Sequence, residues 1–365
     1  MNWYQLSNAS TIDSPALLLY KERIQQNIDR AIDMIGDVNL LWPHVKTNKT
    51  SEVCDMMMNA GITKFKCATI AEAEMLAMLK ANDVLLAYQP VGPKAQRLLQ
   101  LAEQYPHTAF SCITDNVQTA KALSTLFAAA GKTISVYIDL NTGMNRSGIK
   151  PMHATALAAE LMHMPGIQLK GLHAYDGHLR DSDLAQRQQK SNIAFDEVLQ
   201  LAKQIENSTT QPITIVAGGS PTFPTHVQRR VECSPGTFVY WDWGYKHQLP
   251  DEPFEYAALV FTRVISIVDE HTITTDLGHK SVAAENPFPR VHFLNSPEAI
   301  PVAQSEEHLV LKVEDSSKFN LGDELYGVPV HICPTVALYE KAVVVEQSKA
   351  VATWKVVARD RSINV

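Results

Sequence analysis

The chain has 365 residues, of which 45% are hydrophobic and 19% charged, and this composition is typical of a soluble globular protein with a sizeable core. Its net charge of −7 and the lack of any block of lysines and arginines argue against nucleic acid and membrane as partners, and favour a small-molecule ligand. The N-terminus does not read as a secretory leader and no apolar stretch has membrane-spanning length, so we expect a cytoplasmic protein.

Eight short apolar or β-branched runs alternate with helical stretches between about residues 37 and 242. The runs are LLWPHVK, ITKFKCAT, DVLLAYQ, HTAFSCIT, TISVYID, QLKGLHAYD, PITIVAGG and ECSPGTFVYWD. Intervening segments such as SEVCDMMMNAG and AKALSTLFAAAG carry Ala, Leu and Met near helical spacing. Eight βα units of this length predict an α/β fold, a (β/α)8 barrel of the TIM type rather than an open sheet.

Beyond about residue 253 the chain becomes β-rich, with little helical pattern. The strand candidates there are ALVFTRVISIV, HTITTDLG, HLVLKVE, KAVVVEQ and ATWKVVAR, separated by Pro, Gly and Asp turns. We therefore predict a barrel domain over residues 1–252 and a second, mostly β domain over residues 253–365.

Polar residues follow several barrel strands, at the end where barrels of this type place their active sites. The first run ends in Lys46, whose apolar neighbours can partly desolvate it and so permit Schiff-base chemistry, although a solvated lysine is the commoner outcome. Arg146 lies in a glycine-containing loop after the fifth run, and glycine-rich turns follow the seventh and eighth runs at 218–220 and 234–237. Each can be a mere turn, but together they favour a phosphate-bearing ligand.

The strings PHVKTNK, DLNTGMNRSG, HAYDGH, AGGSPT and SPGTF, in that order, resemble the fold-type III enzymes that use pyridoxal 5′-phosphate (PLP), a family that includes alanine racemase. HAYDGH and the later VPVHICPT are similar to the branch of D-threonine aldolases and D-serine dehydratases. The resemblance spans nearly the whole chain, from Ser14 to Thr335. It implies a PLP cofactor and a homodimer with the active site near the subunit boundary.

The resemblance also implies roles for individual residues. Lys46 would carry PLP as a Schiff base, Arg146 would contact the phenolic oxygen of PLP, and Tyr175 would face its ring. The turns at Gly219-Ser220 and Gly236-Thr237 are similar to the phosphate cradle of the family.

Two further positions bear on the type of reaction. Ser234 stands where alanine racemase has an arginine that contacts the pyridine nitrogen, so the chain departs from the racemase pattern. His178, which ends HAYDGH, is a candidate catalytic base, because the aldolases place a base nearby. A histidine satisfied by local backbone is an equally good interpretation.

His331 and Cys333 form the candidate metal site. Two residues apart in an extended segment, they would point to the same side and reach one ion, with water completing the shell, although such pairs are common by accident. The resembling branch has its metal site here. Thiolate with imidazole selects Zn²⁺, whereas a carboxylate would favour Mn²⁺ or Mg²⁺. Val330 and Ala337 replace asparagines that the branch usually has, and the other cysteines are expected to be mostly buried thiols.

These features predict a PLP- and metal-dependent lyase that acts on a D-amino acid with a β-hydroxyl group. In a dehydratase, Lys46 removes the Cα proton and the metal assists departure of the hydroxyl group, giving a 2-keto acid and ammonia. In an aldolase, a base such as His178, or metal-bound water, deprotonates the hydroxyl group, giving glycine and an aldehyde. Cys333 favours the dehydratase.

Three other functions are weaker hypotheses. An amino-acid racemase is disfavoured by Ser234 and by the metal pair. A non-catalytic PLP-binding protein has no need of the second domain. A metal-dependent barrel hydrolase without PLP would leave Lys46 without a role.

Overall fold

The computed structural model describes residues 2–209 and 211–365, which form two compact units. The β-rich unit comprises Met1–Arg30, Thr47–Val53 and Thr237–Arg359, and the barrel unit comprises Ala31–Lys46, Cys54–Gly236 and Asp360–Val365. The boundary predicted at 252/253 marks a change in the composition of the chain, whereas the two units are defined by which residues contact one another.

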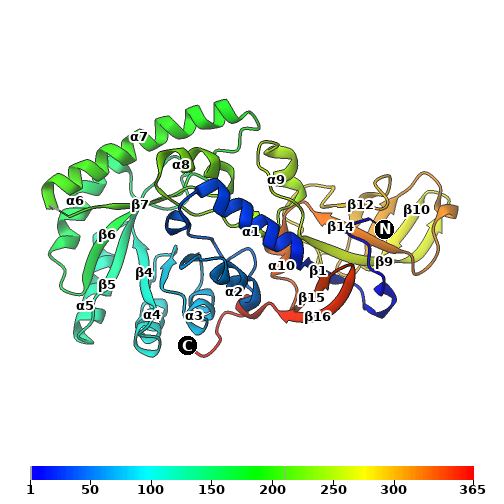
Figure 1. Ribbon diagram of the computed structural model, residues 1–365, viewed down its shortest axis with the longest axis horizontal. Coiled ribbons are helices and arrows are strands. Elements are labelled where there is room, and N and C mark those ends of the chain that lie inside the picture. Colours follow the sequence, from blue (N-terminus) through cyan, green and yellow to red (C-terminus); the bar gives the residue numbers. More distant parts are fainter. Residues whose placement is uncertain (1, 210) are drawn as a thin grey trace. The chain divides into compact units, whose positions relative to one another are not determined.

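The barrel unit contains seven parallel strands that pair in chain order. They are β2 (Lys64–Cys67), β3 (Asp83–Leu86), β4 (Ala109–Thr114), β5 (Ile134–Asp139), β6 (Ile167–Ala174), β7 (Thr214–Ala217) and β8 (Glu232–Cys233). The helices are α3 (Ile70–Met78), α4 (Pro93–Gln104), α5 (Val117–Ala129), α6 (Pro151–Met162), α7 (Leu184–Thr209) and α8 (Phe223–Arg229). Figure 1 shows α3 to α7 around the outside of the strands, which is the arrangement predicted for a barrel of βα units.

The first predicted strand, LLWPHVK, is not a regular strand. It is instead joined to both edge strands by single bridges, Leu41 to Cys233 of β8 and His44 to Lys66 of β2. The Lys66 N–H donates to the carbonyl of Pro43 over 3.0 Å. Proline has no N–H to give to a regular ladder, which explains the irregularity. The segment 41–45 nevertheless lies between β8 and β2, where one more strand would stand, and so closes the sheet. The predicted fold class is confirmed.

The β-rich unit is built on a nine-stranded sheet with the main order β12-β13-β10-β9-β1-β15-β16, and β14 pairs with β9 and β11. The strands are β1 (Ala16–Tyr20), β9 (Ala258–Asp269), β10 (Thr272–Thr275), β11 (Val291–Phe293), β12 (Ile300–Gln304), β13 (Leu309–Lys312), β14 (Glu324–Pro329), β15 (Lys341–Glu346) and β16 (Lys349–Lys355). The predicted strands correspond to β9, β10, β13, β15 and β16. A mostly β second domain is thus confirmed.

β1 was not predicted, yet it lies inside this sheet. It pairs antiparallel with β9 and parallel with β15, and all five of its residues are buried. A short apolar run with no alternation cannot be told from a buried helical segment by periodicity. The remaining helices are α9 (Trp243–Gln248) and α10 (Ile332–Val336) in this unit, and α1 (Lys21–Ile35) and α2 (Ser51–Asn59), which contain residues of both units.

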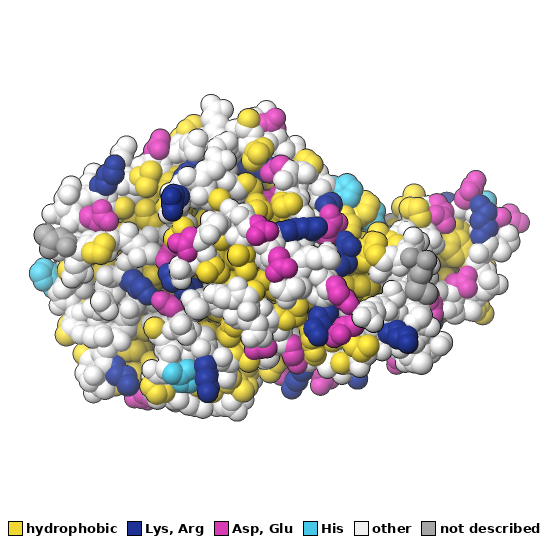
Figure 2. Space-filling view, viewed as in Figure 1, with side chains coloured by type: hydrophobic (Ala, Val, Ile, Leu, Met, Phe, Trp, Pro, Cys, Tyr) yellow, Lys and Arg dark blue, Asp and Glu magenta, His cyan; other side chains and the backbone are white. Residues whose placement is uncertain are grey.

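The surface agrees with the charge analysis. On the face shown in Figure 2, lysines and arginines are interspersed with acidic side chains and form no single-sign field. In the part of the chain that the structure describes, no helix has both the length and the apolar character needed to cross a membrane.

We predict that Leu18→Ala lowers the free energy of unfolding by about 2–5 kcal/mol, because it removes buried methyl groups and leaves a cavity. Leu18 is fully buried in β1 and pairs with Leu259 and Val343. Urea unfolding followed by circular dichroism measures the change. Leu321→Ala is the control, since Leu321 is 67% exposed, and should leave the transition in place. An unchanged transition for Leu18→Ala would contradict a core role for β1.

Candidate cofactor and metal sites

Tyr175, directly after β6, lies at the centre of a cluster of cations in the barrel unit. The centroid of its ring is 5.8 Å from Lys46 Nζ, 5.4 Å from Lys66 Nζ and 4.9 Å from Arg146 Cζ. All three distances are within the range of cation–π attraction. The structure therefore brings together Lys46, Arg146 and Tyr175, and adds Lys66. Several positive groups around one aromatic ring suit an anionic, planar ligand.

Lys66 is a residue that the sequence analysis did not single out. It is fully buried, and its ammonium group donates a short hydrogen bond to Ser234 Oγ. Burial lowers the pKa of Lys66 to about 7, and the charge of Lys46 acts in the same direction, whereas Asp139 and Asp176 oppose them. The signal in the sequence is the run KFKC, where lysine alternates with apolar residues and so falls on one face of a strand.

The two predicted phosphate turns meet each other. Gly236 N–H donates to Ser220 Oγ over 3.3 Å, which links the turn after β8 to the turn after β7. A Cβ on Gly219 would lie only 2.9 Å from Tyr175 Cε2, so the ring packs directly on the glycine backbone. Thr237, the next residue, is the first of the last segment of the β-rich unit.

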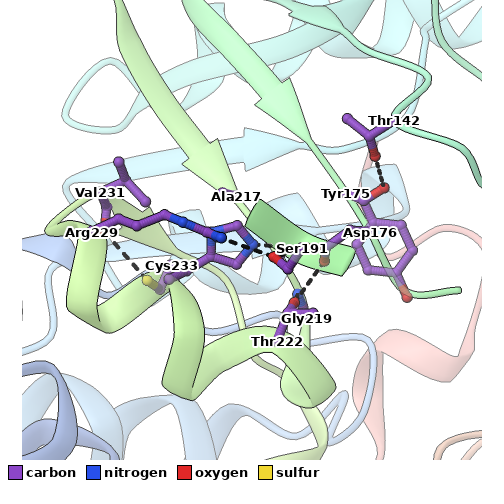
Figure 3. A network of polar contacts seen from close by, with 12 residues as sticks. Thr142, Tyr175, Asp176, Ser191, Ala217, Gly219, Thr222, Arg229, Val231 and Cys233 are labelled. Atoms are coloured by element: carbon purple, nitrogen blue, oxygen red, sulfur yellow. Dashed lines mark hydrogen bonds and ion pairs between the residues drawn. The ribbon is translucent and has the colours of Figure 1, made fainter. Parts of the chain in front are cut away.

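A buried carboxylate holds the first of these turns in place (Figure 3). Asp176, next to Tyr175 in the chain, accepts a 2.6 Å hydrogen bond from Thr222 Oγ1 and a 2.9 Å hydrogen bond from His226 Nε2. Arg229 Nη1 in turn donates to His226 Nδ1 over 2.8 Å. Burial raises the pKa of Asp176, but His226 and Thr222 outweigh it and the net pKa is lowered. The ionised carboxylate therefore fixes the backbone of the turn.

A second buried pair, Asp139 and His173, lies at the ends of β5 and β6. His173 Nδ1 is 2.7 Å from Asp139 Oδ1, and Ser147 donates to the other carboxylate oxygen over 3.0 Å. Burial lowers the pKa of His173 despite the carboxylate, so the ring is neutral and its Nδ1–H points at Asp139. His173 Nε2 is buried and has no hydrogen-bond partner within residues 2–209 and 211–365. This polar atom can meet a bound ligand.

His178, the predicted base, is not part of the Tyr175 cluster. It packs on Gly143, where an added Cβ would lie 2.9 Å from His178 Nε2. It lines a cavity of about 660 Å³ together with residues of α6 and α7. In the described residues, no hydrogen bond or ring contact joins it to Lys46 or Tyr175.

His331 and Cys333 lie in the β-rich unit, and their predicted extended backbone is wrong. Only His331 is extended, with φ −136° and ψ 105°, whereas Cys333 lies in the first turn of α10. Pro334 fits there because the first turn of a helix needs no N–H from it. Cys333 raises the pKa of the His331 ring, so the two side chains lie close to each other.

Polar groups surround this pair. Glu285 Oε1 is 2.6 Å from His331 Nδ1, which orients the ring as carboxylates do for metal-binding histidines. Thr47 Oγ1 is 3.2 Å and Thr237 Oγ1 is 3.6 Å from Cys333 Sγ. Burial lowers the pKa of His331. Cys333, followed by Asp242 and Glu285, outweighs this effect and raises the pKa to about 9.

An imidazole and a thiol are a donor set that fits zinc. No group of three or more His, Cys, Asp or Glu side chains able to hold an ion occurs in residues 2–209 and 211–365, so this pair would need other ligands such as water. The other cysteines, Cys54, Cys67, Cys112 and Cys233, are buried as expected.

Comparison with known proteins matches both parts of the chain. The family model described as "Alanine racemase, N-terminal domain" matches residues 20–242, and the model described as "Putative serine dehydratase domain" matches residues 257–345. D-threonine aldolase of Arthrobacter sp is 28% identical over 360 residues, which are 95% of this chain and 93% of the relative.

D-threo-3-hydroxyaspartate dehydratase of Delftia sp. is 24% identical over 378 residues, covering 94% of this chain and 97% of the relative. The crystal structure of a D-threonine aldolase from Filomicrobium marinum has a TM-score of 0.89 at 26% identity and covers 98% of both chains. The structure of a cysteine-to-alanine variant of a D-threo-3-hydroxyaspartate dehydratase in the metal-free form has a TM-score of 0.84 at 22% identity, over 94% of this chain and 97% of that one, and shares the fold.

The buried Lys66 makes stability depend on pH in a direction that follows from its pKa. Its pKa is about 7 in the folded protein against 10.5 as the reference value, so the unfolded chain binds the proton more tightly. The cost of burying the charge is full below pH 7 and declines as pH rises toward 10.5.

We therefore predict that, between pH 7 and pH 9, the cofactor-free wild type gains stability relative to Lys66→Met by on the order of 1 kcal/mol per pH unit. Urea unfolding at several pH values measures this difference. Lys64→Met, two residues away in the same strand, should keep the wild-type slope. Parallel pH profiles of the wild type and Lys66→Met would contradict the prediction.

Proposed function

The chain belongs to the alanine racemase N-terminal domain family, and on this basis we propose that it is a PLP-dependent lyase that removes water from a D-amino acid with a β-hydroxyl group. The products are a 2-keto acid and ammonia. The observation that carries the choice of dehydratase is the meeting of His331 with the Cys333 thiol. Its relatives include both a dehydratase and aldolases of D-amino acids. A homodimer and a cytoplasmic location stay predictions.

In this proposal PLP, when bound, supplies an electron-withdrawing ring that stabilises negative charge at Cα. The residues assigned to hold it are Lys46, Arg146, Tyr175, Gly219, Ser220, Gly236 and Thr237. Support comes from the three cations around the Tyr175 ring and from the hydrogen bond between the two glycine turns. Asp176 stabilises the turn after β7 through its hydrogen bond with Thr222, and the Tyr175 ring packs on Gly219 of the same turn.

Lys46 would hold PLP as a Schiff base, and its amine would serve as the base that takes the Cα proton. His331 and Cys333 would hold zinc, which supplies a Lewis acid for a hydroxyl group. Within the β-rich unit, the hydroxyl groups of Thr47 and Thr237 both lie near the Cys333 thiol. The metal-free variant of a D-threo-3-hydroxyaspartate dehydratase, whose change is a cysteine to alanine, is consistent with a metal-binding cysteine.

Retro-aldol cleavage is the second candidate, because the D-threonine aldolase of Arthrobacter sp is 28% identical and the aldolase from Filomicrobium marinum superposes at a TM-score of 0.89. In that reaction His178 would take the proton of the β-hydroxyl group. The packing of His178 on Gly143, in a cavity with α6 and α7, does not support this role.

Borohydride reduction of the PLP-loaded protein, followed by proteolysis and mass spectrometry, is predicted to find the cofactor on Lys46. The visible absorbance of the Schiff base should disappear in Lys46→Ala. Lys66 serves as an internal control, because its Nζ lies at a similar distance, 5.4 Å, from the same Tyr175 ring. Cofactor attached to Lys66, or to no lysine, would contradict the assignment of Lys46.

With D-serine as substrate we predict pyruvate and ammonia in equal amounts, and loss of turnover when a chelator removes the metal. Cys333→Ala should lose both zinc and turnover, because the remaining histidine offers a single ligand. Cys112→Ala is the control, since Cys112 is a buried thiol of β4. Glycine and acetaldehyde from D-threonine, with no keto acid, would instead establish the aldolase.

A further inference from the structure

Lys66 and Ser234 form a rigid polar pair in the interior of the barrel. Lys66 Nζ donates to Ser234 Oγ, and that hydroxyl group donates in turn to the carbonyl of Gly218 over 2.9 Å. Both side chains are buried. Since the acceptor has its own fixed partner, the position of the Lys66 amine is determined, 5.4 Å from the centroid of the Tyr175 ring.

The PLP ring has four polar points, and three of them already have partners in the proposed function. These are the aldehyde carbon at Lys46, the phosphate arm at the turn of Gly219 and Ser220, and the phenolic oxygen at Arg146. The fourth is the pyridine nitrogen, opposite the aldehyde carbon. The amine of Lys66 is the remaining cationic donor at the Tyr175 ring.

We infer that Lys66, oriented by Ser234, donates a hydrogen bond to the pyridine nitrogen of PLP and keeps that nitrogen unprotonated. This inference rests on the proposed function, because it requires PLP on Lys46. An amine donates N–H whether it is charged or neutral, so the assignment holds on either side of its titration. The partner at the pyridine nitrogen is one of the means by which a protein tunes this cofactor.

His173 is the competing partner, and it predicts the opposite protonation state. Its Nδ1–H is engaged by Asp139, so its buried Nε2 has no proton to donate and can only accept one. A pyridine nitrogen facing His173 would therefore have to carry a proton. The protonation state of the nitrogen thus distinguishes Lys66 from His173.

An unprotonated nitrogen makes the PLP ring a weaker acceptor of electrons. Negative charge at Cα is then less stabilised by the ring, and loss of a β-substituent depends more on groups outside it. This is consistent with a reaction in which the departing β-hydroxyl group is assisted from outside the ring. Lys66 is thus a positioning residue at the cofactor ring, distinct from Lys46, which reacts.

The test is the ¹⁵N NMR signal of ring-labelled PLP bound to the wild type and to variants of Lys66. We expect the wild type to show an unprotonated, hydrogen-bonded pyridine, and Lys66→Arg to preserve this signal. Lys66→Met should shift the signal toward that of a pyridine without a donor, and Lys66→Glu should shift it to that of a pyridinium. Lys64→Met is the matched control, because Lys64 lies in the same strand and bonds Glu232, and should leave the signal unchanged.

A pyridinium signal in the wild type would overturn the inference, and so would identical signals in the wild type, Lys66→Met and Lys66→Glu. The spectrum of the wild type alone shows whether the pyridine nitrogen is protonated, so the inference can be overturned even if a variant fails to fold. If PLP does not bind, or borohydride does not fix it on Lys46, the proposed function fails. PLP bound at Lys46 with a nitrogen insensitive to Lys66 leaves the proposed function intact and removes only this inference.

Discussion

Closure of the barrel by the segment 41–45 is the constraint on which the candidate cofactor site depends. Without it, β2 and β8 would be the open edges of a seven-stranded sheet, with unpaired backbone groups. The bridges to Cys233 and Lys66 satisfy those edges and, at the same time, deliver Lys46 to the ends of the strands. The bridge partner Lys66 is itself the buried lysine of the Tyr175 cluster, so one pairing fixes the registers of both lysines.

Much of the barrel could be predicted, because parallel strands buried on both faces appear as continuous apolar runs. Lys46 and Arg146 could be singled out because Lys46 ends such a run and Arg146 lies in the loop after one, whereas Tyr175 could be singled out only through the resemblance to the PLP enzymes. Lys66 could not, since it lies within a strand, and its importance depends on Ser234, 168 residues away. The start of α10 directly after His331 also escaped prediction, because a five-residue helix has no periodicity to detect.

Two buried carboxylates, each hydrogen bonded to a histidine, distinguish the interior of this barrel from an ordinary apolar core. Asp139 and Asp176 are both buried and both hydrogen bonded to a histidine, so neither carboxylate lacks a hydrogen-bond partner. Breaking either pair would leave a buried charge without its partner, which is far more costly than an apolar replacement of both. The carboxylate and the histidine of each pair must therefore be kept together or replaced together. Such an arrangement can hold a charged ligand at a fixed position with little reorganisation.

The interleaving of the two units limits how a chain of this kind can change by recombination. Each unit is assembled from three separate segments, so no single stretch of the gene encodes either of them. A crossover near residue 252 would separate β9 from β1, its antiparallel neighbour, and would leave each product with an unpaired sheet edge. The two units are thus inherited as one, because neither can be exchanged by moving a single stretch of the chain.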